Sequence, residues 1–354
     1  AGSLFGCGFE CVAEFLKAVH EAWRTRAQPV WPPWGKRRSS QKKVLFYRDF
    51  LGFTGGHLKV WDYFNHVRHS AHHQPCIAFS SNTVWNDTNP WLAMRGQTLA
   101  AWSAQQADIL FLGGMDWSVL SEAQRRTPPK PVFNLIQHVR HADPNEPLYQ
   151  YLSYRAIRIC VSAPVADALT ATGRVNGPLF TIRNGIDLAA LPPPQSWETR
   201  RLDLLIVGIK QPALATEIHE RLKTSGHRVQ ALTRPLARAD FLELLGNARI
   251  ALLLPNPTEG FYLPALESFA LETLVICPDC VGNRRFCLPG QNCLQPPYTL
   301  EALLHAVRDA VQLIPPARHT LLEAARHTAR QHSLLEERRS FLDILQQTEA
   351  IWRG

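Results

Sequence analysis

The chain has 354 residues, 45% of them hydrophobic, yet it lacks any run of eighteen or more consecutive apolar residues. A helix needs about 20 apolar residues to span a bilayer, so no transmembrane helix is expected. No secretory signal is evident, which predicts a cytoplasmic protein. Helix-turn-helix, RNA-recognition and zinc-finger motifs are also missing, and this absence argues against nucleic acid as a partner.

Cysteine is scarce, with eight residues in the whole chain. In a cytoplasmic protein reduced thiols are the default, so no disulfide framework is expected. Four cysteines fall close together, at Cys277, Cys280, Cys287 and Cys293. Such a set can bind zinc, but Cys277 ends an apolar strand and the later spacings are uneven. Buried free thiols are the favoured interpretation, and a metal site is the alternative.

The net charge is +8, and the densest basic run spans residues 36–43. A basic patch can contact anionic lipid, but a solvated surface run is the simpler explanation. Residues 4–27 carry apolar side chains at steps of three and four, which predicts a helix. It either docks on its own domain or touches the inner face of a membrane, and Glu10, Glu14 and Glu21 weaken the membrane alternative.

Beyond residue 40, continuous apolar strands alternate with helices, a pattern that indicates parallel sheets covered on both faces. We expect an α/β fold with two doubly wound Rossmann-like domains facing each other across a cleft. Residues 1–40 would form an N-terminal helical extension with a Pro/Trp/basic linker, residues 41–190 the first domain and residues 191–334 the second. A C-terminal helix within residues 335–354 would join the first domain.

Individual elements follow from the same pattern. The expected strands are 43–47, 76–80, 109–113, 131–137, 157–162, 202–208, 228–232, 249–254 and 274–277. The expected helices are 58–67, 214–225, 239–246, one starting near Pro264, 300–313, 320–331 and 335–352.

Residues 255–274, PNPTEGFYLPALESFALETL, contain the most informative turn of the chain. An apolar strand leads into it, and Pro264 suits the first position of the helix that follows. The amide groups of Phe261, Tyr262 and Leu263 would then be free at the positive end of the helix dipole. Gly260 would let a ligand approach the backbone closely. Together these features predict an anion site, with phosphate as the usual anion.

Two carboxylates flank this predicted anion site, Glu259 before the turn and Glu267 one helical turn inside. Carboxylates repel phosphate but accept hydrogen bonds from hydroxyl groups. A ligand with phosphate in the middle and hydroxyl groups at both ends fits, and a nucleotide sugar has this form. The alternative is an ordinary strand–loop–helix unit in which Glu267 is a helix N-terminal carboxylate.

Polar candidates also follow strands of the first domain. Gly55 and Gly56 lie in a glycine turn between a strand and a helix, and His138 lies at the carboxyl end of a strand, where ligands bind in such sheets. Trp85 and Trp91 could stack on an acceptor sugar, although a core position is commoner for tryptophan. Satisfied or exposed side chains remain the alternative for His138.

Glu259 to Glu267 resembles the E-x7-E signature of retaining GT-B glycosyltransferases of the family-four type. The remaining matches come in the order that this family has: the Gly55–Gly56 turn, Ser162 at a strand end, Asn184-Gly185-Ile186-Asp187 at the domain junction, Gly208 with Lys210, and Gly282-Asn283. The resemblance covers about residues 43–350.

The resemblance implies roles for these residues. Lys210 would neutralise the donor diphosphate, Glu259 would hold donor-sugar hydroxyls, Glu267 would bind the ribose, and His138 would lie near the sugar and the acceptor. The donor side would further include Gly55, Gly56, Asn184, Gly208, Arg234, Gly260 and the amides of Phe261, Tyr262 and Leu263. The family usually has an arginine and a lysine after the glycine, whereas this chain reads Gly208-Ile209-Lys210. Arg234 and Arg284 are candidates for the second cation.

The implied activity is transfer of a sugar from a nucleoside-diphosphate sugar to a glycan or lipid-linked acceptor with retention of the anomeric configuration. No cofactor is implied, and no convincingly placed Asp-x-Asp motif suggests a metal. Three alternatives remain: a GT-B enzyme that epimerises or phosphorolyses its substrate, a non-catalytic nucleotide-sugar or glycan-binding subunit and, least favoured, a nucleic-acid-binding protein.

Overall fold

The computed structural model describes residues 41–354, and Lys42–Gly354 form one compact unit. The predicted helix over residues 4–27, the Pro/Trp linker and the basic residues 36–38 lie outside the described residues. No helix within residues 41–354 is long and apolar enough to cross a membrane.

The first sheet has six parallel strands in the order β2-β1-β3-β4-β5-β6. Its strands are β1 (Lys42–Arg48), β2 (His73–Phe79), β3 (Ile109–Gly113), β4 (Val132–Ile136), β5 (Ile157–Cys160) and β6 (Leu179–Thr181). Every residue of β3, β4 and β5 is buried. Burial on both faces explains why β3 reads as an unbroken apolar run. The buried polar residues Asn134 of β4 and Arg158 of β5 each donate hydrogen bonds to backbone carbonyls.

The second sheet has four parallel strands in the order β10-β9-β7-β8. Its strands are β7 (Leu202–Val207), β8 (Val229–Leu232), β9 (Ala248–Leu253) and β10 (Leu274–Ile276). Buried apolar clusters form on both faces of this sheet. The expectation of two doubly wound, Rossmann-like parallel sheets is therefore confirmed.

Helices connect the strands and cover both sheets. The α-helices are α2 (Gly55–Arg68), α3 (Glu122–Arg126), α4 (Ala163–Ala171), α5 (Pro212–Leu222), α6 (Arg238–Gly246), α7 (Leu263–Ala270), α8 (Leu300–Gln312), α9 (Pro315–Gln331), α10 (Leu334–Gln346) and α11 (Thr348–Arg353). Short 3-10 helices occur at Leu92–Gln97, Ala104–Gln106, Gly114–Val119, Val139–Ala142 and Pro147–Ser153.

Three local differences from the sequence-based expectations have physical causes. Helix α2 begins at Gly55, three residues earlier than expected, because the Thr54 hydroxyl accepts a hydrogen bond from the His57 amide at 3.3 Å and caps the helix. The single helix expected over 335–352 is divided at Gln347, where the Thr348 hydroxyl donates to the Leu345 carbonyl at 2.6 Å. The three-residue edge strand β6 was not predicted.

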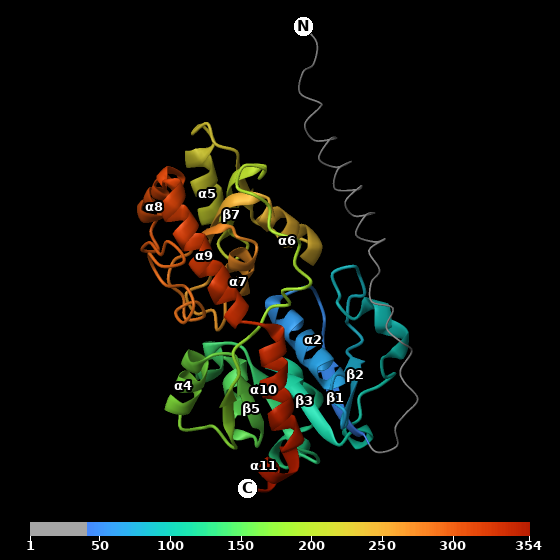
Figure 1. The fold of residues 1–354 in the computed structure, drawn as a ribbon. Helices are drawn as coiled ribbons and strands as arrows, with labels where there is room; N and C mark the ends of the chain where they lie inside the picture. The colour runs from blue at the N-terminus through green and yellow to red at the C-terminus, as the bar shows by residue number, and fades with distance from the viewer. Residues whose placement is uncertain (1–40) are drawn as a thin grey trace. The chain divides into compact units, whose positions relative to one another are not determined.

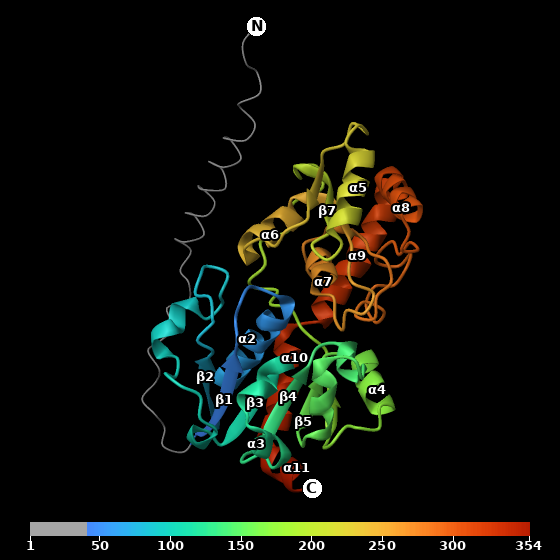
Figure 2. The ribbon, with the colours of Figure 1, turned by 180° about the vertical axis from the view of Figure 1, so that it is seen from behind.

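Helix α10, close to the C-terminus, lies beside α2 on one face of the first sheet (Figure 1). From behind, β3, β4 and β5 pass in front of α10 (Figure 2). Phe341 of α10 packs edge-on against Tyr63 of α2 at a centroid distance of 4.8 Å and against Phe133 of β4 at 5.7 Å. The last part of the chain is thus built into the core of the first sheet.

A buried ionic cluster joins α2, α10 and the loop after β6. The Lys59 ammonium is 2.6 Å from a Glu337 oxygen and 2.8 Å from an Asp62 oxygen, and it donates to the Gly185 carbonyl at 3.2 Å. The other Glu337 oxygen is 3.0 Å from His66 Nε2. Lys59 and Glu337 are almost completely buried, so each charge depends on the others for stabilisation.

Candidate functional site

Strand order identifies where ligands are expected in the second sheet. The connection after β7 leads to the edge strand β8, and the connection after β9 leads to β10 at the opposite edge. The neighbouring strands β7 and β9 therefore form the topological switch point. Ligands of doubly wound sheets bind beyond the carboxyl ends of such strands. Lys210 follows β7 and Glu259 follows β9, so both predicted residues lie at the switch point.

A pocket of about 240 Å³ surrounds these two side chains. Its lining is His138, Arg140, Lys210, Asn256, Thr258 and Glu259. The Lys210 ammonium is 3.9 Å from a Glu259 oxygen, and the backbone of His138 forms an antiparallel bridge with that of Glu259. The structure therefore brings together Lys210, Glu259 and His138, which the sequence analysis assigned to catalysis.

The His138 imidazole is neutral at neutral pH. Burial, together with the charges of Arg140 and Lys210, lowers its pKa from 6.5 to about 4. Its Nδ1 accepts a hydrogen bond from the Arg140 amide at 3.0 Å, so the remaining proton resides on Nε2. His138 can consequently donate a hydrogen bond to a hydroxyl group without adding positive charge.

Two helix N-termini lie close to each other beside this pocket. Helix α7 begins at Leu263, with Pro264 in its first turn, close to the predicted start. A β-carbon on Gly55, the first residue of α2, would lie 3.9 Å from Leu263 Cδ1. Both helices present the positive ends of their dipoles here, an arrangement that favours an anionic group.

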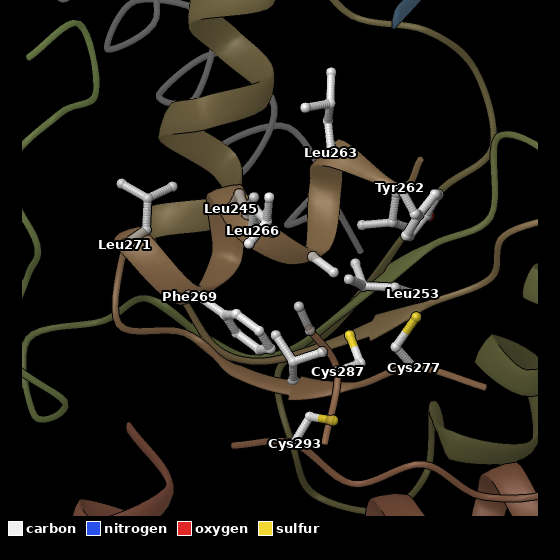
Figure 3. Close-up of a cluster of buried hydrophobic side chains, with 14 of the residues drawn as sticks. Leu245, Leu253, Tyr262, Leu263, Leu266, Phe269, Leu271, Cys277, Cys287 and Cys293 are labelled. Atoms are coloured by element: carbon white, nitrogen blue, oxygen red, sulfur yellow. The ribbon is translucent and has the colours of Figure 1, made fainter. Parts of the chain in front are cut away.

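The prediction of three free amides at the start of α7 is wrong for Tyr262. Its amide donates to the Gly282 carbonyl in a long hydrogen bond of 3.4 Å. The side chains of Tyr262 and Leu263 are buried in the apolar cluster beneath the helix (Figure 3). Gly282 allows this approach, because a β-carbon there would lie 2.5 Å from the Phe261 amide nitrogen.

Gly260 and Gly208 serve protein packing. A β-carbon on Gly208 would lie 2.1 Å from the β-carbon of Ala215, so this glycine lets α5 approach β7. The Gly260 backbone contacts the Gln137 backbone at the place where a ligand was expected. The Gly260 carbonyl also accepts a hydrogen bond from the Ser162 hydroxyl at 3.0 Å. The Gln137 side chain also donates to the Gly56 carbonyl at 3.1 Å. Gln137, unassigned from sequence, thus connects both glycine turns.

We expect Gly260→Ala to lower the free energy of unfolding by about 1–3 kcal/mol. The new β-carbon would lie 2.1 Å from the Gln137 carbonyl oxygen and 2.8 Å from its carbon, and backbone atoms cannot move aside cheaply. Gly52→Ala is the control, because no heavy atom lies within 4 Å of its β-carbon position. Urea denaturation measures both variants, and equal stabilities would contradict this role of Gly260.

Glu267 lies deeper in α7 and is 1% exposed. One carboxylate oxygen is 2.5 Å from Arg238 Nη2, at the start of α6, and the other oxygen is buried without a hydrogen-bond partner among the described residues. Arg238 was not identified from sequence, since a single arginine in an exposed-looking helix start carries no motif. A buried carboxylate with one unused oxygen can accept a hydrogen bond from a ligand hydroxyl.

Arg284, a candidate for the second cation, pairs with the Asp279 carboxylate through contacts of 2.7–3.0 Å and is not among the residues that line the pocket. Arg234 is exposed after β8 and forms no ion pair with any residue of 41–354. The pocket lining instead provides Arg140, two residues after His138. Its position in the polar strand end Gln137–His141 was the signal that could have identified it.

Asn184 lies at the crossing between the two sheets and is not among the residues that line the pocket. Its carbonyl accepts a hydrogen bond from His332 Nδ1 at 3.3 Å, and Ile186 bridges with Ser333. Gly185 is required here, because a β-carbon would lie 2.4 Å from the Ser333 carbonyl oxygen. These contacts hold the two crossing segments together.

The four clustered cysteines are free thiols buried in the core of the second sheet. Cys277, Cys287 and Cys293 lie near one another below α7 (Figure 3). Hydrogen bonds with Cys277 and Cys293, together with burial, raise the pKa of Cys287. Within residues 41–354 no group of three or more histidine, cysteine, aspartate or glutamate side chains is arranged to hold a metal ion.

Trp91 and Trp85 differ in exposure. Trp91 is completely buried and packs edge-on against Trp61 at a centroid distance of 5.3 Å, so it is a core residue and not a platform for a sugar. Trp85 is half-buried, and the Arg95 guanidinium lies over its ring at 5.2 Å.

Several solved structures share this fold. The chain is similar to HepE from Anabaena in complex with UDP-glucose, with 15% identity, a TM-score of 0.64 and coverage of 87% of this chain and 100% of that one. Sucrose-phosphate synthase from Thermosynechococcus elongatus is 12% identical, with a TM-score of 0.63 and coverage of 88% and 100%. A glycosyltransferase from Rickettsia africae is 16% identical, with a TM-score of 0.57 and coverage of 87% and 98%. The fold is therefore that of GT-B glycosyltransferases.

Sequence comparison also matches part of the chain to a known family. Residues 168–312 match the family model described as glycosyl transferases group 1. The matched stretch contains Lys210, Glu259 and Glu267. No curated protein sequence matches the chain.

Proposed function

We propose that the protein transfers a sugar from a nucleoside-diphosphate sugar to a glycan or lipid-linked acceptor, with retention of the anomeric configuration and without a metal ion. The observation that carries this proposal is the pocket in which Lys210 and Glu259, from the switch point of the second sheet, meet His138 from the first. The group 1 family match over residues 168–312 supports the same reaction class.

The proposed chemistry follows from where charge develops. When the bond between the anomeric carbon and the diphosphate oxygen breaks, negative charge grows on the leaving nucleoside diphosphate. Lys210 and the N-termini of α2 and α7 stabilise that charge, and fixed positive groups of this kind contribute strongly to catalysis. Glu259 accepts hydrogen bonds from sugar hydroxyls, and the neutral His138 donates one from Nε2.

Bond formation occurs on the face that the diphosphate leaves. The acceptor hydroxyl oxygen attacks the anomeric carbon, and its proton passes to a departing diphosphate oxygen. The product keeps the anomeric configuration of the donor, and this route uses no protein nucleophile. Lys210 and the helix N-termini take the part that a divalent cation has in metal-dependent transferases.

The test is a panel of UDP-, GDP- and ADP-sugars, incubated with the protein while release of nucleoside diphosphate is measured. We expect release with one class of donor, no loss of rate when EDTA is present, and retained configuration in the product by NMR. Absence of both binding and release for the whole panel would overturn the proposed function. Loss of activity in EDTA would overturn only its metal independence.

A non-catalytic nucleotide-sugar-binding subunit is the second candidate, favoured by one observation. Lys210 is the single lysine or arginine after β7 in the pocket lining, and Glu259 partly neutralises it at 3.9 Å. Donor binding detected by calorimetry, without release of nucleoside diphosphate in the presence of any acceptor tried, would support this candidate over the transferase.

A further inference from the structure

We propose that Arg238 is a positioning residue for Glu267: it holds one carboxylate oxygen so that the other is presented to a ribose hydroxyl of the donor nucleotide. This inference rests on the proposed function, because it concerns the nucleotide part of the same donor. It adds a residue that lies outside the E-x7-E segment and predicts that discrimination between ribose and deoxyribose depends on Arg238.

The first support is the asymmetry of the Glu267 carboxylate. Arg238 Nη2 contacts Oε1 at 2.5 Å, whereas Oε2 is buried and has no partner among residues 41–354. Leaving a buried acceptor unpaired is costly, so natural proteins rarely keep one without a use. A ligand hydroxyl would supply the missing donor.

The second support is the position of Arg238 itself. The Arg238 side chain is 32% exposed and the Glu267 side chain 1% exposed, so the arginine reaches the surface whereas the carboxylate does not. Glu267 belongs to α7, whose N-terminus lies beside that of α2. A nucleotide that binds with its diphosphate at those helix N-termini would place its ribose beside α7, the helix that carries Glu267.

The third support is charge. Burial lowers the pKa of Arg238, but the carboxylates of Glu267 and Asp62 outweigh burial and raise it. Arg238 thus remains a cation beside the buried Glu267 carboxylate. Hydrogen bonds in which one partner is charged are stronger than those between neutral groups, so this contact can hold the carboxylate in one orientation.

The experiment compares UDP, GDP and ADP with their 2′-deoxy and 3′-deoxy forms by isothermal titration calorimetry on the full chain. We expect the natural protein to bind the ribonucleotide about 10- to 100-fold more tightly than at least one deoxy form. The Arg238→Met variant should bind the ribonucleotide and the deoxy form with affinities within about threefold of each other. Arg238→Lys, which keeps the charge, should restore part of the discrimination. A purely structural arginine would alter both affinities equally.

Arg326→Met is the control, because it removes an arginine that pairs with Glu272 at 3.2 Å elsewhere in the second sheet region. It should keep the discrimination of the natural protein. If Arg238→Met does not fold, Arg238→Gln retains a hydrogen-bond donor without the charge and serves the same comparison. The proposal would be overturned if Arg238→Met or Arg238→Gln discriminated between the ribonucleotide and its deoxy forms as well as the natural protein does. It would also be overturned if the natural protein did not discriminate between them. Absence of nucleotide binding in the natural protein would instead overturn the proposed function.

Discussion

Replacing Lys59 by methionine is expected to lower the free energy of unfolding by about 3–5 kcal/mol, the range for breaking a buried ion pair from one side. Lys59 is 1% exposed and contacts Glu337 at 2.6 Å and Asp62 at 2.8 Å. Methionine has a similar volume but leaves both carboxylates without their cation. Urea denaturation followed by tryptophan fluorescence measures the loss, since Trp91 and Trp117 are buried around the first sheet.

Two comparisons make this result specific. Lys42→Met removes a surface pair with Glu349, 46% and 48% exposed, and should cost less than about 1 kcal/mol. The double variant Lys59→Met with Glu337→Gln should recover part of the loss, because it removes the unpaired buried charge. A Lys59→Met variant as stable as Lys42→Met would contradict the importance of the cluster.

The pH dependence of this effect has a definite sign. Burial raises the pKa of Glu337, but Lys59 and His66 outweigh burial and hold it below its ordinary value of 4.5. A depressed folded-state pKa contributes stability above the unfolded pKa, and this contribution is lost as the pH falls through the folded one. The difference between natural protein and Lys59→Met should therefore narrow as the pH falls below 4.5.

Lys210→Ala is expected to lower kcat by about 100- to 1,000-fold in the proposed transfer reaction, as the loss of a fixed positive group facing a developing negative charge does elsewhere. Lys210 lines the pocket and is 49% exposed, so its removal should leave the fold intact. Release of nucleoside diphosphate measures kcat and KM, and the pKa of His138 should rise because Lys210 contributes to its lowering.

The control for this variant is Lys223→Ala, which removes an exposed lysine that pairs with Glu220 just after α5. Its kcat should match that of the natural protein. Lys210→Arg should keep part of the activity, since the charge is retained with a different shape. A Lys210→Ala variant with kcat within threefold of the natural protein would show that other groups stabilise the leaving diphosphate.

Much of the fold could be predicted because its signals are local. Unbroken apolar strands such as Ile109–Gly113 indicated parallel sheets, and Pro264 indicated the start of α7. The edge strand Leu179–Thr181 was missed because it is three residues long and not fully buried. The division of the last helix at Gln347 is accompanied by a hydrogen bond from the Thr348 hydroxyl to the Leu345 carbonyl, which a periodic pattern does not reveal.

The candidate site was predicted in part. Lys210, Glu259 and His138 were found because each follows a strand, and the carboxyl ends of parallel strands meet at one edge. Their convergence in one pocket required the tertiary structure. The free amide expected at Tyr262 and the close ligand approach expected at Gly260 are not observed. The Tyr262 amide donates to the Gly282 carbonyl, and the Gln137 backbone lies against Gly260.

The sequence by itself determined the class of fold and the loop PNPTEGFYLPALESFALETL as the centre of the site, because strand periodicity, helix starts and glycine turns depend on neighbouring residues. The tertiary structure decided which of these groups are free to act. Arg238 against Glu267, and Lys59 against Glu337, are contacts between elements far apart in the chain. Such contacts depend on how helices and sheets pack, and no local pattern encodes their distances.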